Sequence, residues 1–289
     1  MLFFPCLFKV RLVLRRINWS ILGYIFWIFI MANIVAGIAH ANDNDSNAIN
    51  WAFQVGLGDG FSIGTQENAN VYKLPFSYTT RHLRDYEWGL KLKFPLTVGV
   101  YNIETADKDI DLDVLAIVPG IELQIPVRDN WILIPLLNFG LGKNTSGGDL
   151  QYLYSVGIKH HVFFGWKNLD FTFGNTLRND GYFTDGNDNS DNVPLFSTYL
   201  DMRFPLGFNL LNKSGYLSLY AINYYYFDDV TVIDSETIPI EVDTQWELGI
   251  TFSSIPSWKF WFFEIERVGL GYRFGDGFSA IRLVFGMPF

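Results

Sequence analysis

Cysteine is almost absent from this sequence. Cys6 is the one cysteine among 289 residues, and only three histidines, His82, His160 and His161, follow residue 41. A single thiol forms no intramolecular disulfide, and the Cys and His positions match no zinc-binding spacing. We therefore predict no disulfide framework, no metal ligands and no cofactor.

Basic residues are also few. The sequence holds 21 Lys and Arg against 30 Asp and Glu, for a net charge of −9. Four of the basic residues lie before position 42, where there is no acidic residue, and the remainder, with 17 basic and 30 acidic residues, has a net charge of −13. Because such a chain repels a phosphate backbone, nucleic acid is excluded as a predicted partner.

Residues 1–41 have the features of a secretory signal peptide. Basic residues at positions 9–16 precede an apolar stretch at 21–30, and Ala39-His40-Ala41 fits an A-x-A cleavage site. The alternative is an uncleaved inner-membrane helix over residues 17–38, which are nearly enough to span a bilayer. No other long hydrophobic run follows in the sequence.

From residue 51 on, apolar and polar residues alternate with a period of two, which is the pattern of a β-strand with two different faces. In residues 240–252 the even positions include Trp246 and Leu248, whereas the odd positions include Gln245 and Glu247. The same alternation recurs in residues 88–100, 169–173, 196–204 and 267–274. Aromatic residues make up 18% of the sequence, which suits a surface that faces lipid and carries aromatic girdles.

These patterns predict an all-β fold, a closed antiparallel transmembrane β-barrel preceded by the signal-peptide helix. The sheet is expected to close because backbone groups in hydrocarbon must all be hydrogen-bonded. The chain would divide into the signal peptide at residues 1–41, a short periplasmic segment at 42–50 and the barrel at 51–289. We predict about twelve strands, at residues 51–58, 71–80, 86–103, 110–126, 131–142, 150–164, 168–178, 194–205, 215–227, 239–252, 260–274 and 278–289.

An even number of strands places both ends of the barrel on the periplasmic side and sorts the connections into two sets. The outer connections are mostly long and acidic, at residues 59–70, 104–109, 143–149, 179–193, 228–238 and 275–277. The inner connections are mostly shorter and more basic, at residues 81–85, 127–130, 165–167, 206–214 and 253–259. Long outer loops and short periplasmic turns are typical of outer-membrane barrels. The predicted location is therefore the Gram-negative outer membrane, reached through a cleaved signal peptide.

Residues 281–289 alternate as well and end on Phe289, which resembles the C-terminal targeting strand of Gram-negative outer-membrane barrels, apart from Pro288. Aromatic and glycine patterns resemble the solitary autotransporter-type outer-membrane barrel domain at residues 88–95, 118–122, 131–142 and 269–274. The resemblance covers most of residues 50–289 and implies a twelve-stranded barrel without a passenger domain and without established catalytic residues. The class implies as partners the barrel-assembly machinery, periplasmic chaperones, outer-membrane lipids and lipopolysaccharide.

We predict no catalytic residues. An outer-membrane protease or lipid A deacylase needs a base, usually His, near the outer rim of the barrel. His82 falls in an inner connection, and His160 and His161 fall near the inner end of their strand. The two adjacent histidines are expected to point in opposite directions, one toward lipid headgroups and the other toward the lumen. Gly269-Leu-Gly271 lacks the following helix of a phosphate-binding loop, so we expect strand glycines at a close contact.

Two segments of the sequence each have two possible interpretations, and the state of the lumen is also open. Tyr224–Phe227 is interpreted as part of an aromatic belt at the membrane interface, and a sugar-stacking platform is the alternative. The acidic residues of loop 179–193 are interpreted as solvated, and shared divalent cations with lipopolysaccharide phosphates are the alternative. Charged side chains expected to point into the lumen are Lys91, Lys93, Glu122, Arg128, Lys159, Asp201, Arg203, Glu241, Asp243, Glu247, Arg267 and Arg273. Because these charges can pair across a small bore, we predict a narrow or occluded lumen.

The sequence thus predicts an outer-membrane β-barrel protein with a structural or narrow-channel, porin-like role. One alternative is a barrel enzyme that acts on lipid A or peptides. Another is a surface adhesion or receptor barrel formed by the acidic loops. The oligomeric state stays open.

Overall fold

The computed structural model describes residues 60–64, 69–83, 87–104, 109–144, 149–186, 190–210, 213–231, 241–260, 263–276 and 278–289. Every regular element in these ranges is a strand, and all strand pairings are antiparallel. The all-β antiparallel class predicted from the sequence is confirmed. In this part of the chain no helix has the length and apolar character needed to cross a bilayer. The predicted signal peptide, the segment 42–50 and the predicted strand 51–58 lie outside the described residues.

The strands follow the predicted ones closely from residue 71 on, and several are longer. Their bounds are β1 (Gly60–Gly64), β2 (Ala69–Arg81), β3 (Gly89–Glu104), β4 (Asp109–Ile117), β5 (Gly120–Arg128), β6 (Trp131–Asn144), β7 (Gln151–Trp166), β8 (Leu169–Thr184), β9 (Ser190–Leu210), β10 (Lys213–Thr231), β11 (Glu241–Phe260), β12 (Phe263–Gly275) and β13 (Phe278–Phe285).

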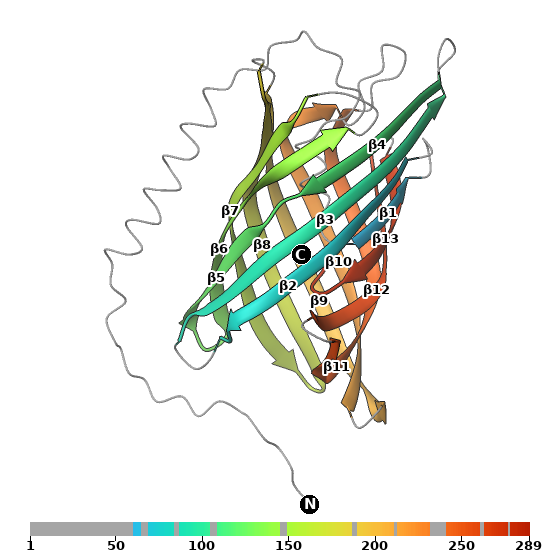
Figure 1. Cartoon of the computed structure of the whole chain (residues 1–289). Coiled ribbons are helices and arrows are strands. Elements are labelled where there is room, and N and C mark those ends of the chain that lie inside the picture. The colour runs from blue at the N-terminus through green and yellow to red at the C-terminus, as the bar shows by residue number, and fades with distance from the viewer. Residues whose placement is uncertain are drawn as a thin grey trace, which may run out of the picture.

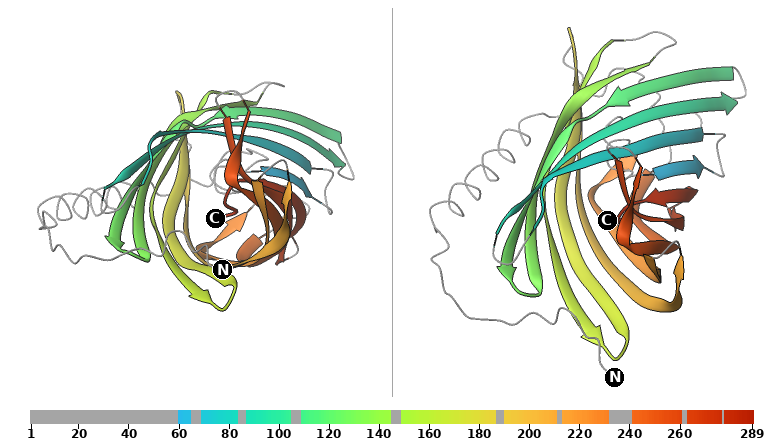
Figure 2. Two further views of the ribbon diagram at one scale, coloured as in Figure 1. Left: turned by 90° about the horizontal axis from the view of Figure 1, so that it is seen from below. Right: turned by 60° about the horizontal axis from the view of Figure 1, so that its bottom comes forward.

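The strands form one sheet in which sequence neighbours pair with each other. β1 pairs on one side with β2 and on the other side with β13, so that Phe61 lies opposite both Tyr72 and Leu283. The ribbon views show the sheet curving strongly around a common axis (Figures 1 and 2). We call the concave face the inner face and the convex face the outer face.

β4 and β5 occupy one position in the sheet, between β3 and β6. The sequence predicts a single strand here, at residues 110–126, and the structure interrupts it at Val118-Pro119. Proline has no N–H to donate to a ladder. The neighbouring backbone still bridges the gap, since Val118 N donates to Pro95 O at 3.3 Å and Phe139 N donates to Pro119 O at 2.9 Å.

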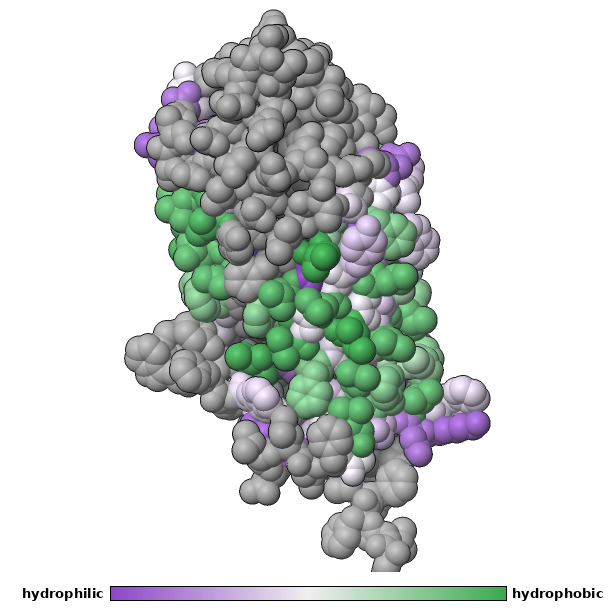
Figure 3. Space-filling view, turned by 90° about the vertical axis from the view of Figure 1, so that its right-hand side faces the viewer, coloured by the Kyte–Doolittle hydropathy of each residue, from purple (hydrophilic) through white to green (hydrophobic). Residues whose placement is uncertain are grey.

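The predicted alternation separates the two faces of the sheet. On β11, Trp246 and Leu248 are 47% and 51% exposed on the outer face, whereas Gln245 and Glu247 are fully buried on the inner face. In Figure 3 hydrophobic residues cover much of the described surface, and hydrophilic residues gather near its upper and lower borders. Among the described residues, buried polar and charged side chains outnumber buried hydrophobic ones. This is the reverse of the partition in a soluble globular domain.

Strand residues extend into most of the predicted connections, and the predicted inner connection 253–259 lies wholly within β11. The predicted loop 59–70 holds β1 and the first residues of β2, and the predicted loop 179–193 holds the end of β8 and the start of β9. The Asp, Asn and Gly content of 179–193 favours turns in sequence reasoning. An inner face lined by polar partners accepts such residues in strands, and Asp180 is accordingly only 1% exposed.

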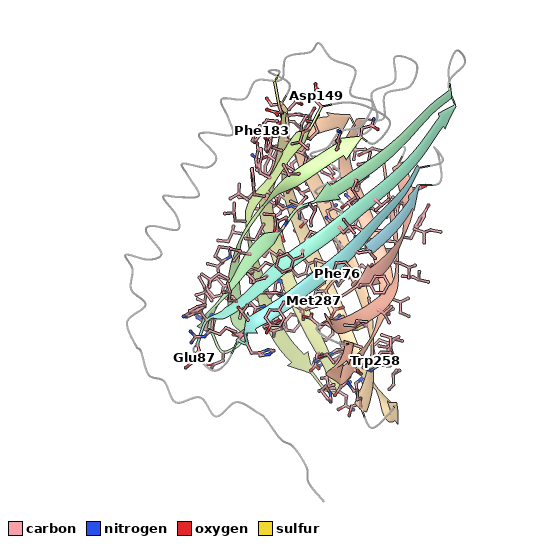
Figure 4. The ribbon with its side chains drawn as sticks, in the orientation of Figure 1. Phe76, Glu87, Asp149, Phe183, Trp258 and Met287 are labelled. Carbon is pink, nitrogen blue, oxygen red and sulfur yellow. The ribbon has the colours of Figure 1, made fainter. Side chains whose placement is uncertain are left out.

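The C-terminal strand ends earlier than predicted. β13 stops at Phe285, Gly286 adopts a positive φ of 88°, and Met287-Pro288-Phe289 leave the sheet. The prediction of a strand through Phe289 is therefore wrong after Phe285. The turn is compatible with Gly286, because glycine tolerates positive φ, and Pro288 cannot donate to a ladder. Figure 4 shows Met287 near the middle of the sheet, between the end that carries Glu87 and Trp258 and the end that carries Asp149 and Phe183.

Candidate functional site

The inner face carries several clusters of paired charges. In the first, Glu247 on β11 accepts hydrogen bonds from Tyr220 Oη at 2.7 Å and from Tyr224 Oη at 3.1 Å. The guanidinium of Arg282 on β13 forms an ion pair with Glu247 Oε2. All four side chains are buried. A buried carboxylate keeps its charge at low cost only when such partners surround it.

The phenol of Tyr220 in this cluster occupies the space that a side chain at either of two glycines would need. A Cβ atom added at Gly271 would lie 2.3 Å from Tyr220 Oη, and one added at Gly249 would lie 2.4 Å from the same atom. The prediction that Gly271 is a strand glycine at a close contact is confirmed. The small residues on β11 and β12 thus make room for the phenol that binds Glu247.

A second cluster lies next to the first. Arg273 Nε donates to Gln245 Oε1 at 2.6 Å, and Arg273 Nη2 donates to Tyr226 Oη at 2.5 Å. The guanidinium carbon of Arg273 also lies 4.0 Å from the ring centroid of Tyr224. Tyr224 and Tyr226, the inward-facing residues of the run Tyr224–Phe227, therefore contact arginine side chains instead of forming part of an aromatic belt at the membrane interface.

A third cluster joins strands that are not neighbours in the sheet. Arg267 Nη1 on β12 donates to the two carboxylate oxygens of Asp201 on β9 at 2.8 and 2.9 Å, and to Ser218 Oγ at 3.1 Å. Lys91 Nζ on β3 likewise donates to Glu266 Oε1 on β12 at 3.0 Å. Side chains from distant strands thus meet across the concave side of the sheet.

A fourth cluster surrounds Glu122 on β5. Lys159 Nζ and Lys93 Nζ donate to the same oxygen, Glu122 Oε1, at 2.9 and 3.4 Å. Nearby on β8, Arg178 Nε lies 2.8 Å from Asp180 Oδ2. These pairs bring cations from β3, β7 and β8 to one region of the inner face.

A cavity of about 80 Å³ lies beside these cations and the last three residues of the chain. The charged residues that line it are Lys73, Lys93, Lys159 and Arg178. Because one water needs roughly 10–15 Å³ of such volume, the cavity has room for several waters or one small solute. It is much smaller than the roughly 300–1,000 Å³ of a typical drug-sized ligand site.

Phe289 packs on the inner face rather than in β13. Its ring stacks on Tyr199 with a centroid separation of 3.6 Å and meets the edge of the His161 ring at 5.8 Å. Tyr199 Oη in turn donates to the backbone carbonyl of His160 at 2.9 Å. Met287, Pro288 and Phe289 therefore form an apolar side of the cavity against the opposite wall of the sheet.

The three histidines lie where the sequence predicts. His82 is exposed just beyond the end of β2, and His161 is buried on the inner face. His160 lies on the other face, beside Trp131 and Phe173, and its Nε2 is 3.0 Å from Asn175 Nδ2. The expected opposite orientation of the adjacent pair is confirmed. In the described ranges no three His, Cys, Asp or Glu side chains gather as a metal site would require.

Two members of the predicted inward-facing set are wrong. Arg128 is exposed at the end of β5, and Asp243 is exposed rather than inward-facing. At Asp243 a register shift between Tyr225 and Val230 of β10 changes the phase of the alternation. The side chain of Glu241 lies outside the described residues. The remaining members of the predicted inward set lie on the inner face: Lys91, Lys93, Glu122, Lys159, Asp201, Arg203, Glu247, Arg267 and Arg273.

The run Tyr224–Phe227 is divided between the faces. Tyr224 and Tyr226 are buried on the inner face, so the aromatic-belt interpretation is wrong for them, whereas Tyr225 and Phe227 are exposed. A sequence run of four aromatic residues conceals the alternation that separates them. Asp180 of the predicted loop 179–193 is buried in β8 against Arg178, so both the solvated interpretation and the cation-binding alternative are wrong at this residue.

The inner-face charges missing from the predicted set include Lys73, Arg178, Asp180 and Arg282, together with Glu266, the partner of Lys91. Arg282 lies between Ile281 and Leu283, so the alternation of those apolar neighbours is the signal that places it inward. Arg178 and Asp180 were missed because their segment was interpreted as the end of a strand followed by a loop.

The sequence matches no protein-family model, and a search of curated proteins finds no match either.

Proposed function

We propose that the chain is a transmembrane β-barrel of the Gram-negative outer membrane, with twelve strand positions in a closed sheet. The observation that carries the proposal is the reversed partition of the two faces. Large apolar side chains are exposed on the outer face, and ionic and hydroxyl groups are buried inside. Contact of such an apolar outer face with lipid is favourable, whereas its exposure to water is unfavourable.

The strand pairings support closure. β1 pairs with β2 and with β13, at four residue positions in each case, so the first described strand is joined to the last one. β4 and β5 share one position, so the thirteen strands of the described residues support a count of twelve positions. In hydrocarbon an unpaired edge would leave backbone groups unsatisfied at a cost of several kcal/mol each.

The strand lengths support a membrane span. β6 to β12 each contain 13 to 21 residues, and about 9–11 residues of tilted strand cross a bilayer. The proposal includes export through a signal peptide and insertion by the barrel-assembly machinery with periplasmic chaperones. It also includes the likeness to the autotransporter-type barrel domain without a passenger.

We propose a structural or narrow-channel role for this barrel rather than a catalytic one. The interior charges contact one another across the sheet, as Arg267 does with Asp201 and Lys91 does with Glu266. Phe289 and its neighbours add an apolar group inside. Side chains so arranged restrict the bore to small solutes.

Heat-modifiable gel mobility tests the membrane proposal. The full chain, expressed in a Gram-negative host, should be recovered with the outer-membrane fraction, and unboiled and boiled samples should migrate differently. Recovery as a freely soluble protein after lysis without detergent would overturn the proposal. Planar-bilayer recordings of the purified protein then test the lumen: small or absent conductance is expected, and large stable steps would contradict a restricted bore.

A further inference from the structure

The cavity beside the C-terminal residues has an unusual wall for a protein interior. Four basic side chains reach it from four strands: Lys73 from β2, Lys93 from β3, Lys159 from β7 and Arg178 from β8. The described residues that line the cavity include no Asp or Glu. We propose that this cavity binds a small inorganic oxyanion of the phosphate or sulfate type. The proposal goes beyond membrane location and does not depend on it.

The two nearby carboxylates hold the cations without lining the cavity. Glu122 contacts Lys159 at 2.9 Å and Lys93 at 3.4 Å through a single oxygen, and Asp180 contacts Arg178 at 2.8 Å. An ammonium has three N–H donors and a guanidinium has five, so each of these cations can pair with more than one acceptor at a time. The carboxylates thereby fix the cations in place beside the cavity.

Neutral donors complete the wall. Asn138, Thr176 and Ser197 also line the cavity, and their side chains carry an amide and two hydroxyl groups. An oxyanion has several acceptor oxygens, and hydrogen bonds from cationic donors to such oxygens are the short, strong kind. The donor set therefore suits an anion with several oxygens better than a cation or a neutral solute.

The volume of the cavity and its apolar residues further restrict the class of ligand that fits. The volume of about 80 Å³ admits an anion of a few heavy atoms and excludes a nucleotide or a lipid headgroup with its chains. Val118, Leu195, Ile222 and the tail residues Met287, Pro288 and Phe289 add apolar wall. Apolar surroundings lower the local dielectric constant and strengthen the attraction between an enclosed anion and the cations.

Isothermal titration calorimetry with inorganic phosphate tests the proposal on the full chain, folded in detergent. Sodium chloride at matched ionic strength controls for screening, and sodium sulfate tests whether the site accepts the wider oxyanion class. Lys93→Gln removes one cavity cation while Glu122 keeps its closer partner, Lys159. Lys91→Gln is the matched control, because Lys91 lies on the same strand and inner face but pairs with Glu266 and does not line the cavity.

The expected result is saturable phosphate binding that weakens roughly tenfold in Lys93→Gln and little in Lys91→Gln, as the loss of one charge-assisted contact implies. At the same concentration, phosphate should also raise the unfolding temperature of the wild type by more than that of the variant. If Lys93→Gln does not fold, Lys73→Gln serves as the second cavity variant. The proposal is overturned if folded wild type shows no saturable heat up to about 10 mM phosphate, or if the cavity and control variants weaken binding equally. Either outcome leaves the membrane proposal standing, because gel mobility reports on that separately.

Discussion

An arginine placed on the outer face of β11 tests whether that face meets lipid. Leu248 lies near the middle of the strand, is 51% exposed and is opposite Ala221 on β10 and Tyr272 on β12. In water, substitution of such an exposed residue changes the free energy of unfolding by no more than about 0.5 kcal/mol. At the midplane of a bilayer, an arginine on the lipid face costs about 2–4 kcal/mol. The two environments therefore give answers that differ well beyond experimental error.

A second position tests whether the cost of an arginine depends on its depth in the bilayer. Phe227 is 53% exposed near the end of β10, in the bulge opposite Asp243, which is five residues from Leu248 along β11. At about 3.3 Å per residue, the two positions are roughly 17 Å apart along the strand direction. Near the interface an arginine costs only about 0–1 kcal/mol.

The assay is reversible guanidinium unfolding of Leu248→Arg and Phe227→Arg in phospholipid vesicles, with Leu248→Phe as the control that keeps the position apolar. We expect a loss of about 2–4 kcal/mol for Leu248→Arg, at most about 1 kcal/mol for Phe227→Arg, and little change for the control. A cost for Leu248→Arg below about 0.5 kcal/mol, or one equal to that of Phe227→Arg, would refute the reasoning.

Three further predictions follow from the inner face. Glu247→Gln should cost about 3–5 kcal/mol, because it leaves a buried arginine without its carboxylate, whereas Glu87→Gln at an exposed ion pair should cost less than about 1 kcal/mol in the same unfolding assay. Gly271→Ala should cost about 1–3 kcal/mol, because its Cβ would overlap a tyrosine hydroxyl at 2.3 Å, and Gly165→Ala, whose Cβ would meet nothing closer than 3.8 Å, should be nearly neutral. Phe289→Ala should increase single-channel conductance in planar bilayers by removing an aromatic ring from the interior, and conductance identical to wild type would show that this ring does not restrict the bore.

The alternation of side chains was enough to predict most of the strands and most of their faces, but not β1 or the break between β4 and β5. Around Leu248 and Glu247 the sequence alternates between apolar residues and polar or small ones, and burial follows the same period. That signal is local, because a strand exposes successive residues to opposite faces whatever its partners are. The adjacent residues His160 and His161 were divided between the faces for the same reason.

The parts that sequence reasoning missed depend on distant contacts. Nothing near Phe289 in the sequence shows that its ring would stack on Tyr199, ninety residues away, instead of continuing β13. The sequence around Asp180 is typical of a loop. Its burial in a strand depends on the contact with Arg178 and on the polar inner face, which the local sequence does not show. Tyr224 is masked by neighbouring aromatic residues, and only the register of β10 against β11 reveals that it points inward.

Disulfide cross-linking of β1 to β13 tests the central claim most directly. Ile63 and Ile281 lie opposite each other in the pairing that joins the first strand to the last, so Ile63→Cys with Ile281→Cys brings two thiols within bonding range on oxidation. The account predicts an intramolecular disulfide in protein extracted from the outer-membrane fraction, seen as a mobility shift on a non-reducing gel, and none for Ile63→Cys with Val284→Cys. Absence of the cross-link in the first variant, or its formation only in water-soluble protein, would contradict a closed barrel in the membrane.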